Sequence, residues 1–179
     1  MKSALLVIDV QAGLCTGEYA AFEAERVIER INSVARKARA VSAPVVFIQH
    51  QSEDGVLNYG SAGWRLAPGL EVLPGDLHVH KKTTDSFHQT ELGRVLQELG
   101  ISELVVCGLQ SEFCVDTTVR RALALGYPVV LVKDGHSTMD NAVLKADQIS
   151  RHHTCTLENI ESFGVRARAV AASEVAFVA

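Results

Sequence analysis

Residues 104–134 have the sequence LVVCGLQSEFCVDTTVRRALALGYPVVLVKD, which predicts a strand, a helix and a second strand in succession. An apolar run rich in β-branched residues ends at Gly108, a helical pattern extends from about Phe113 to Leu125, and a second apolar run begins at Pro128. Such a strand–helix–strand unit is typical of a parallel sheet. Cys114 lies in the first turn of the helix, just beyond the strand. A cysteine at this position could be a nucleophile or a structural residue.

The same alternation of apolar runs and helical patterns continues along the chain. It indicates an α/β fold: a single domain, residues 1–179, with a mostly parallel open sheet of about six strands and helices on both faces, in a Rossmann-like arrangement. The longest irregular segment, residues 51–75, contains Trp64 and has the length of a functional loop. We expect the other strands at residues 4–10, 44–50, 77–82 and 165–170, and the other helices at residues 20–40 (with Phe22 on the apolar face), 90–100 and 141–153.

Composition excludes several classes of function. The 179 residues have a net charge of −4 and no basic block, so nucleic acid is not an expected partner. No run approaches eighteen apolar residues, and the first apolar run meets Asp9 too early for a signal peptide, so neither a membrane span nor secretion is expected. The four cysteines form no CxxC pair, which favours a reducing cytoplasm over a disulfide framework or a zinc site.

Residues that could take part in catalysis stand at the carboxyl ends of three of the predicted strands. Asp9 ends the first strand, Lys81 and Lys82 end the third, and Cys114 follows the fourth after a short turn. Ligands bind beyond the carboxyl ends of parallel strands, so an acid, a cation and a thiol are expected to converge at one edge. Together they would form a covalent acyl-transfer site. Each residue singly also has a structural interpretation, as a loop cap, a solvated lysine or a small buried side chain.

The chain resembles the isochorismatase-like cysteine hydrolases, the superfamily of nicotinamidases, N-carbamoylsarcosine amidases and isochorismatases. The resemblance covers roughly residues 4–155, through the motifs LLVIDVQ, HKKTTDSFHQTEL and LVVCGLQSEFCVDTTVRRALALGYPVVLVKDGHST. It implies a catalytic triad in which Cys114 is the nucleophile, Asp9 the general base and Lys81 the residue that holds the thiolate. It also implies a cis peptide between Leu109 and Gln110, which would aim the N–H groups of Gln110 and Cys114 at the oxyanion.

One departure from the family pattern bears on cofactors. Nicotinamidases follow the second strand with an Asp–x–His metal motif, whereas this chain has IQHQSED there, with His50 but without the aspartate. We therefore expect no metal and no other cofactor. The cysteine favours C–N hydrolysis through a thioester. The alternatives are vinyl-ether hydrolysis of the isochorismatase type, and a non-enzymatic role as a small-molecule-binding or redox-sensing thiol protein.

The remaining predictions concern the substrate and the assembly. A small, neutral or weakly polar amide is the expected substrate, contacted by Gln11, Trp64, Glu112 and Phe113. The resemblance and a positive mean hydropathy also predict a homo-oligomer, a dimer or larger. Side chains alternate faces along a strand, so only one of the two lysines can face the thiol, and the spacing to Phe87 in the family motif selects Lys81.

Overall fold

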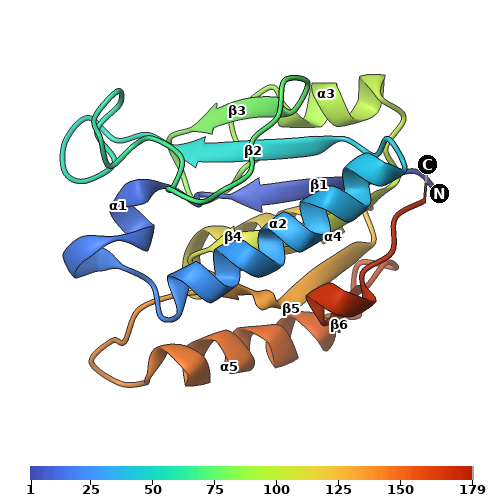
Figure 1. The fold of residues 1–179 in the computed structure, drawn as a ribbon. Coiled ribbons are helices and arrows are strands. Elements are labelled where there is room, and N and C mark those ends of the chain that lie inside the picture. Colours follow the sequence, from blue (N-terminus) through green and yellow to red (C-terminus); the bar gives the residue numbers. More distant parts are fainter. Residues whose placement is uncertain (179) are drawn as a thin grey trace.

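Six strands form one sheet in a computed structural model that describes residues 1–178. The strands lie in the order β3-β2-β1-β4-β5-β6, and every neighbouring pair is parallel (Figure 1). The predicted α/β fold with a parallel sheet is confirmed. The strands are β1 (Ser3–Ile8), β2 (Val45–His50), β3 (Leu77–Lys81), β4 (Glu103–Leu109), β5 (Val129–Ser137) and β6 (Ala167–Val170).

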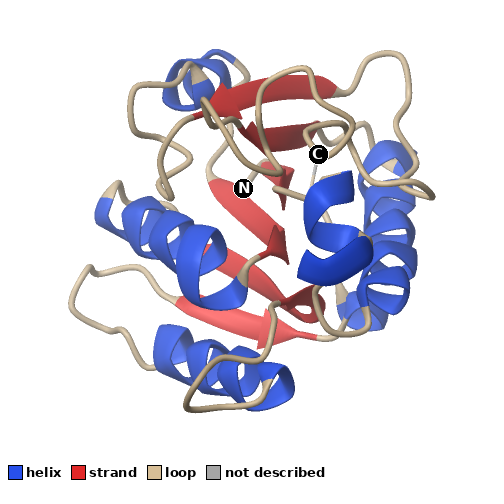
Figure 2. Cartoon of the chain, turned by 90° about the vertical axis from the view of Figure 1, so that its left-hand side faces the viewer, coloured by secondary structure: helices blue, strands red, loops and turns tan. Residues whose placement is uncertain are grey.

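Helices cover both faces of the sheet. One face packs against α2 (Ala24–Ala40) and the short 3-10 helix η3 (Ala172–Glu174), through an apolar cluster that includes Ile31 and Phe47. The opposite face packs against α3 (Leu92–Glu98), α4 (Asp116–Ala124) and α5 (Ala146–Glu158). Figure 2 shows the sheet between these two layers. The short α1 (Ala12–Cys15) and η1 (Gly17–Tyr19) follow β1.

The burial of the strands explains their apolar sequences. Every residue of β1 and of β4 is buried, because these central strands have a helix layer on each face. A strand buried on both faces requires a nearly continuous apolar run, which is what residues 4–8 and 104–109 provide.

The chain changes direction in the sheet between β1 and β4. From β1 it passes to β2 and β3 on one side, and then returns to place β4 on the other side. The segments that follow β1 and β4 therefore diverge at their carboxyl ends and leave a crevice, which is the usual ligand position in open parallel sheets. Asp9 and Cys114 belong to these two segments.

Two predicted details were wrong. The last long helix begins at Ala146 rather than near residue 141, because the side chain of Asn141 accepts hydrogen bonds from the N–H groups of Val143 and Leu144 in a turn. Phe22 precedes α2 and is 51% exposed instead of lying on its apolar face. Its backbone is bonded to the segment that ends β5, where Ser137 donates to the Phe22 carbonyl.

The two ends of the described chain meet at the amino edge of the sheet. The N–H of Ser3 donates to the carbonyl of Val178 at 2.9 Å, and both ends lie together in Figure 1. Among the helices of residues 1–178, none has the length and apolar character needed to cross a membrane.

Candidate active site

Asp9, Lys81 and Cys114 meet at the carboxyl edge of the sheet. Lys81 Nζ lies 2.7 Å from Asp9 Oδ2 and 3.2 Å from Cys114 Sγ. All three residues are buried: Lys81 and Asp9 are each 1% exposed and Cys114 is 9% exposed. The convergence expected from the ends of three strands is therefore present in the structure.

The alternation of β3 selects Lys81 over its neighbour. Val79 and Lys81 are buried, whereas His78, His80 and Lys82 are exposed. Although β2 lies between β3 and β1, the Lys81 side chain brings its ammonium group to Asp9, beyond β1. Lys82 projects toward solvent, as the strand pattern predicts.

The Lys81 ammonium group has four neighbours. Besides Asp9 Oδ2 and Cys114 Sγ, it lies 3.0 Å from the carbonyl oxygen of Thr83 and 3.2 Å from His50 Nδ1. Burial opposes the charge, but attraction to Asp9 and Cys114 prevails and raises the pKa of Lys81. Lys81 is therefore an ammonium ion at neutral pH.

Cys114 is a thiol rather than a standing thiolate in this environment. Burial and the Asp9 carboxylate raise the pKa of Cys114 to about 12, and the opposing effect of Lys81 is too small to reverse this. Lys81 acts in the direction that favours the thiolate, and its role in holding the thiolate during the reaction remains a prediction. The sulfur needs a base at the moment it reacts.

Asp9 has an oxygen available as that base. Oδ2 accepts from Lys81, while Oδ1 is buried and has no hydrogen-bond partner in the part of the chain that the structure describes. A carboxylate oxygen of Asp9 lies within 4.8 Å of Cys114 Sγ. The left-handed backbone of Asp9, with φ 50°, turns the chain from β1 into α1 directly beyond the strand.

The turn that presents Cys114 depends on a close approach of two strands. Gly108, near the end of β4, has φ +119°, and a Cβ atom there would lie 2.1 Å from the carbonyl oxygen of Ile8. The peptide bond between Leu109 and Gln110 is cis, as the family resemblance implied. The chain then enters the π-helical turn η2 (Ser111–Val115), in which the N–H groups of Phe113 and Val115 both donate to the Gln110 carbonyl. The helical pattern in the sequence predicts an ordinary helix start here, so the π-helical turn is a departure from that prediction.

A buried hydrogen-bond network braces this turn from α5. Ser111 Oγ lies 2.7 Å from His136 Nδ1 and 2.9 Å from Ser150 Oγ, and His136 Nε2 lies 2.9 Å from Thr154 Oγ1. Burial and the nearby His153 lower the pKa of His136 to about 4, so the ring is neutral and both nitrogens are paired. No pattern in the sequence predicts this network, because Ser111 is 25 residues from His136 and 39 residues from Ser150.

The residues predicted to contact substrate have different surroundings. Gln11 is fully buried, and its side-chain amide donates to the carbonyls of His50 and Trp64 and accepts from the N–H of His50. Both of its donor hydrogens are therefore used to join the end of β2 to the long loop. The Trp64 ring contacts Tyr59 and His80 edge-on, on the strand face opposite to Lys81.

Glu112 and Phe113 lie on the nucleophile turn. Phe113 is 51% exposed. Glu112 Oε1 accepts from Thr138 Oγ1 at 2.9 Å, and its buried Oε2 has no partner among residues 1–178. These two residues remain candidates for substrate contact, and the roles of the Gln110 and Cys114 N–H groups at an oxyanion remain predictions.

His50 was considered in the sequence only as a metal ligand. Asp9, His50 and Cys114 do present donor atoms within 4.8 Å of one another. However, Lys81 Nζ is within hydrogen-bonding distance of all three residues, so an ammonium ion stands where a metal cation would have to bind. The two cations would repel each other, which disfavours a metal at this position.

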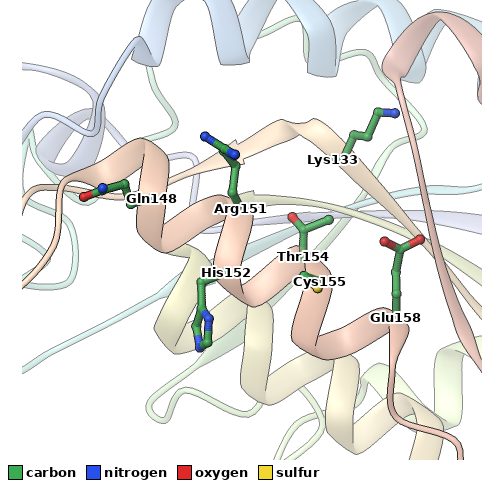
Figure 3. A pocket seen from close by; sticks show the side chains of 7 residues that line it. All are labelled: Lys133, Gln148, Arg151, His152, Thr154, Cys155 and Glu158. Carbon is green, nitrogen blue, oxygen red and sulfur yellow. The ribbon is translucent and has the colours of Figure 1, made fainter.

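Two surface cavities differ in their position relative to the site. A cavity of about 180 Å³ borders the site, with Lys81 in its wall. A larger cavity of about 610 Å³ is lined by residues of α5 and by Lys133 of β5, and has no member of the Asp9, Lys81 and Cys114 group in its wall (Figure 3). The smaller one is lined by Gln51, His80, Lys81, Lys82, Thr83, His88 and Gln89.

Comparison with known proteins supports a family assignment. Residues 3–165 match the isochorismatase domain model. The chain is 41% identical over 138 residues to streptothricin hydrolase of Streptomyces noursei, covering 76% of this chain and 55% of that protein. It is 27% identical over 199 residues to ureidoacrylate amidohydrolase of Caulobacter vibrioides, covering 90% and 84%. The chain spans about half the length of the streptothricin hydrolases that it matches.

Solved structures support the same assignment. A crystal structure of an isochorismatase family protein is 33% identical, with a TM-score of 0.86 over 94% of this chain and 98% of the other. The similarity therefore extends over nearly the whole sheet and its helices.

Proposed function

The chain belongs to the isochorismatase family, and from that premise we propose that it is a cysteine hydrolase that cleaves an amide-type C–N bond of a small molecule through a thioester on Cys114. The observation that carries the proposal is the buried contact of Lys81 Nζ with both Cys114 Sγ and Asp9 Oδ2, beside the unpaired Asp9 Oδ1. Nucleophile, base and cation are the parts that acyl transfer requires.

In the first half of the reaction, Cys114 becomes acylated by the substrate. Asp9 takes the thiol proton as the sulfur attacks the carbonyl carbon, so that a C–S bond forms while the carbonyl oxygen becomes an oxyanion. Lys81, already cationic, stabilises the negative charge that develops on sulfur. The C–N bond then breaks, and the proton on Asp9 passes to the departing nitrogen. The N–H groups of Gln110 and Cys114 are proposed to donate to the oxyanion.

In the second half, water releases the acid. Asp9, again a carboxylate, takes a proton from the water that attacks the thioester carbon, the C–S bond breaks, and the proton returns to the sulfur. One water is consumed, and the products are an acid and an amine or ammonia. Because Cys114 begins and ends as a thiol, its raised pKa is consistent with this cycle.

The names of the relatives support nitrogen-containing substrates. Streptothricin hydrolase and ureidoacrylate amidohydrolase are both hydrolases, and the second is named for amide-type cleavage. We propose a small, neutral or weakly polar amide for this chain, contacted by Glu112 and Phe113 on the nucleophile turn. We further propose that no metal ion takes part, because the Lys81 ammonium group occupies the centre of the potential ligand set.

A panel of small amides, read by ammonia release, tests the proposal. Wild type should turn over at least one member, and Cys114→Ala should lower kcat by at least about a thousandfold, since removal of a nucleophile costs several orders of magnitude. Cys155→Ala is the matched control, because Cys155 is the exposed free cysteine, on α5. Activity of Cys114→Ala within tenfold of wild type would refute the proposed nucleophile.

The same assay tests the metal-free proposal. Activity should survive dialysis against a strong chelator. A loss that zinc, iron or manganese restores would show that the site binds a metal. If thiol alkylation is fast but the panel gives no product, the thiol-sensor interpretation gains support instead.

A further inference from the structure

We propose that His50 is a positioning residue of the cysteine site: its Nδ1 competes with Cys114 Sγ for the third hydrogen of the Lys81 ammonium group, and so controls whether that hydrogen reaches the sulfur. The inference rests on the proposed function for its role in catalysis. The hydrogen-bond geometry itself is independent of any substrate.

The Lys81 ammonium group has fewer hydrogens than there are acceptors around it. An ammonium group has three donor hydrogens and no acceptor. Lys81 Nζ has four potential acceptors within 3.2 Å: Asp9 Oδ2 at 2.7 Å, the Thr83 carbonyl at 3.0 Å, and both His50 Nδ1 and Cys114 Sγ at 3.2 Å. The two shortest contacts, to a carboxylate and a carbonyl, use two hydrogens. One hydrogen remains for the two longest contacts.

His50 can accept that hydrogen because its ring is neutral. Burial and the neighbouring Lys81 charge lower the pKa of His50, outweighing Asp9 and a hydrogen bond with the Thr83 carbonyl, which act in the opposite direction. The charged and titratable groups that face the ring are Asp9 beyond β1, Lys81 on β3 and Cys114 on the π-helical turn. A neutral ring whose Nδ1 carries no hydrogen can accept from Lys81, whereas a ring with a hydrogen on Nδ1 cannot.

The backbone of His50 is held in place by Gln11. The Gln11 side chain binds both the N–H and the carbonyl of His50, at 2.9 Å each. The backbone of His50 therefore has little freedom to move, and the competition is decided by where the hydrogens lie. With Nδ1 bare, the third hydrogen is shared with His50 and Cys114 keeps its proton. When Asp9 takes that proton, the same hydrogen can turn to the negatively charged sulfur.

Two nearly isosteric substitutions test this inference. His50→Asn places an amide oxygen or nitrogen near the position of Nδ1 and can play both hydrogen-bonding roles, whereas His50→Leu removes them at similar volume. Both are made in the Cys155→Ala background, so that the exposed cysteine does not react. The readout is the rate of alkylation of Cys114 by iodoacetamide across pH, with thermal melting to confirm folding.

His50→Leu should shift the alkylation profile to lower pH by about one unit, which is about a tenfold faster reaction at pH 7.5, because the third hydrogen of Lys81 then remains on the sulfur. His50→Asn should follow wild type. A Leu profile that coincides with wild type, a rate change that is equal at every pH, or an Asn variant that shifts as far as Leu would overturn the inference.

These outcomes are separable from those of the proposed function. A shifted profile with no turnover of any amide would leave the role of His50 in thiol ionisation intact while refuting the hydrolase. Turnover that depends on Cys114 with an unshifted profile would refute only the role of His50.

Discussion

Lys81 combines two roles at the scale of a single residue. Its ammonium group neutralises the buried carboxylate of Asp9 and contacts the sulfur of Cys114, so one side chain serves both stability and the proposed chemistry. A buried carboxylate without a cationic partner is strongly unfavourable. Strand alternation predicted that only one of the two lysines faces the thiol, and the spacing to Phe87 in the family motif selected Lys81, which is the buried one.

Lys81→Met and Lys82→Met form a matched pair of adjacent substitutions. Lys81→Met should abolish measurable turnover and lower the free energy of unfolding by about 3 kcal/mol or more, because it leaves Asp9 buried and unpaired. Lys82→Met should change both quantities little, because Lys82 is exposed. Urea titration and ammonia release measure the two effects. If Lys82→Met had the larger effects, Lys82 rather than Lys81 would be the lysine of the triad.

At the scale of secondary-structure elements, hydrogen bonds of His136 connect β5 to α5 and to the nucleophile turn. His136 on β5 joins Ser111 on the turn to Thr154 on α5, with both ring nitrogens paired. Protonation of the ring would replace an acceptor by a donor and place a charge in a buried site. The network is therefore intact only while His136 is neutral.

This network predicts a loss of stability in acid. The pKa of His136 is about 4 in the folded protein and the ordinary value is 6.5, so the unfolded state binds more protons between these values. Stability therefore falls as pH falls through this window, by about 1.4 kcal/mol per pH unit from this group. The stability that the neutral His136 ring contributes is fully present above pH 6.5.

His136→Asn isolates the contribution. Urea titrations at pH 7 and pH 5 should show that wild type loses about 2 kcal/mol more on acidification than the variant does, since the variant has no ring to protonate. Other titrating groups are common to both proteins and cancel in the comparison. An equal loss in the two proteins would mean that His136 does not remain neutral in the fold.

At the scale of the whole molecule, several apolar side chains are exposed at the carboxyl edge of the sheet. Phe22 and Phe113 are each 51% exposed and Val143 is 83% exposed, all in segments that follow the carboxyl ends of strands. Large exposed apolar side chains in one region commonly mark an interface. We propose a homo-oligomer, a dimer or larger, whose interface is formed by this edge.

Cytoplasmic location stays a prediction.

Light scattering at micromolar concentration tests the assembly. Wild type should give at least twice the chain mass of 19.3 kDa. Val143→Glu should shift the mass toward the monomer, whereas Phe163→Glu, in the turn between α5 and β6, should not. A monomer mass for wild type would contradict the proposal.

Local patterns in the sequence were sufficient for much of the architecture. Apolar runs in β1 and β4 predicted buried parallel strands, and the ends of the strands predicted that Asp9, Lys81 and Cys114 would converge. These features follow from periodicity and from the common direction of parallel strands, which depend on neighbouring residues and on a general rule of sheets.

Contacts between distant residues were decided only by the tertiary structure. Gln11 binds the backbone of His50, Lys81 contacts His50 as well as Cys114, and Ser111 contacts His136, across 25 to 39 positions of sequence. The high pKa of the Cys114 thiol likewise arises from burial by elements far apart in the chain. Hydrogen bonds and desolvation depend on separations of a few ångströms in space, and no local pattern of residue types encodes those separations.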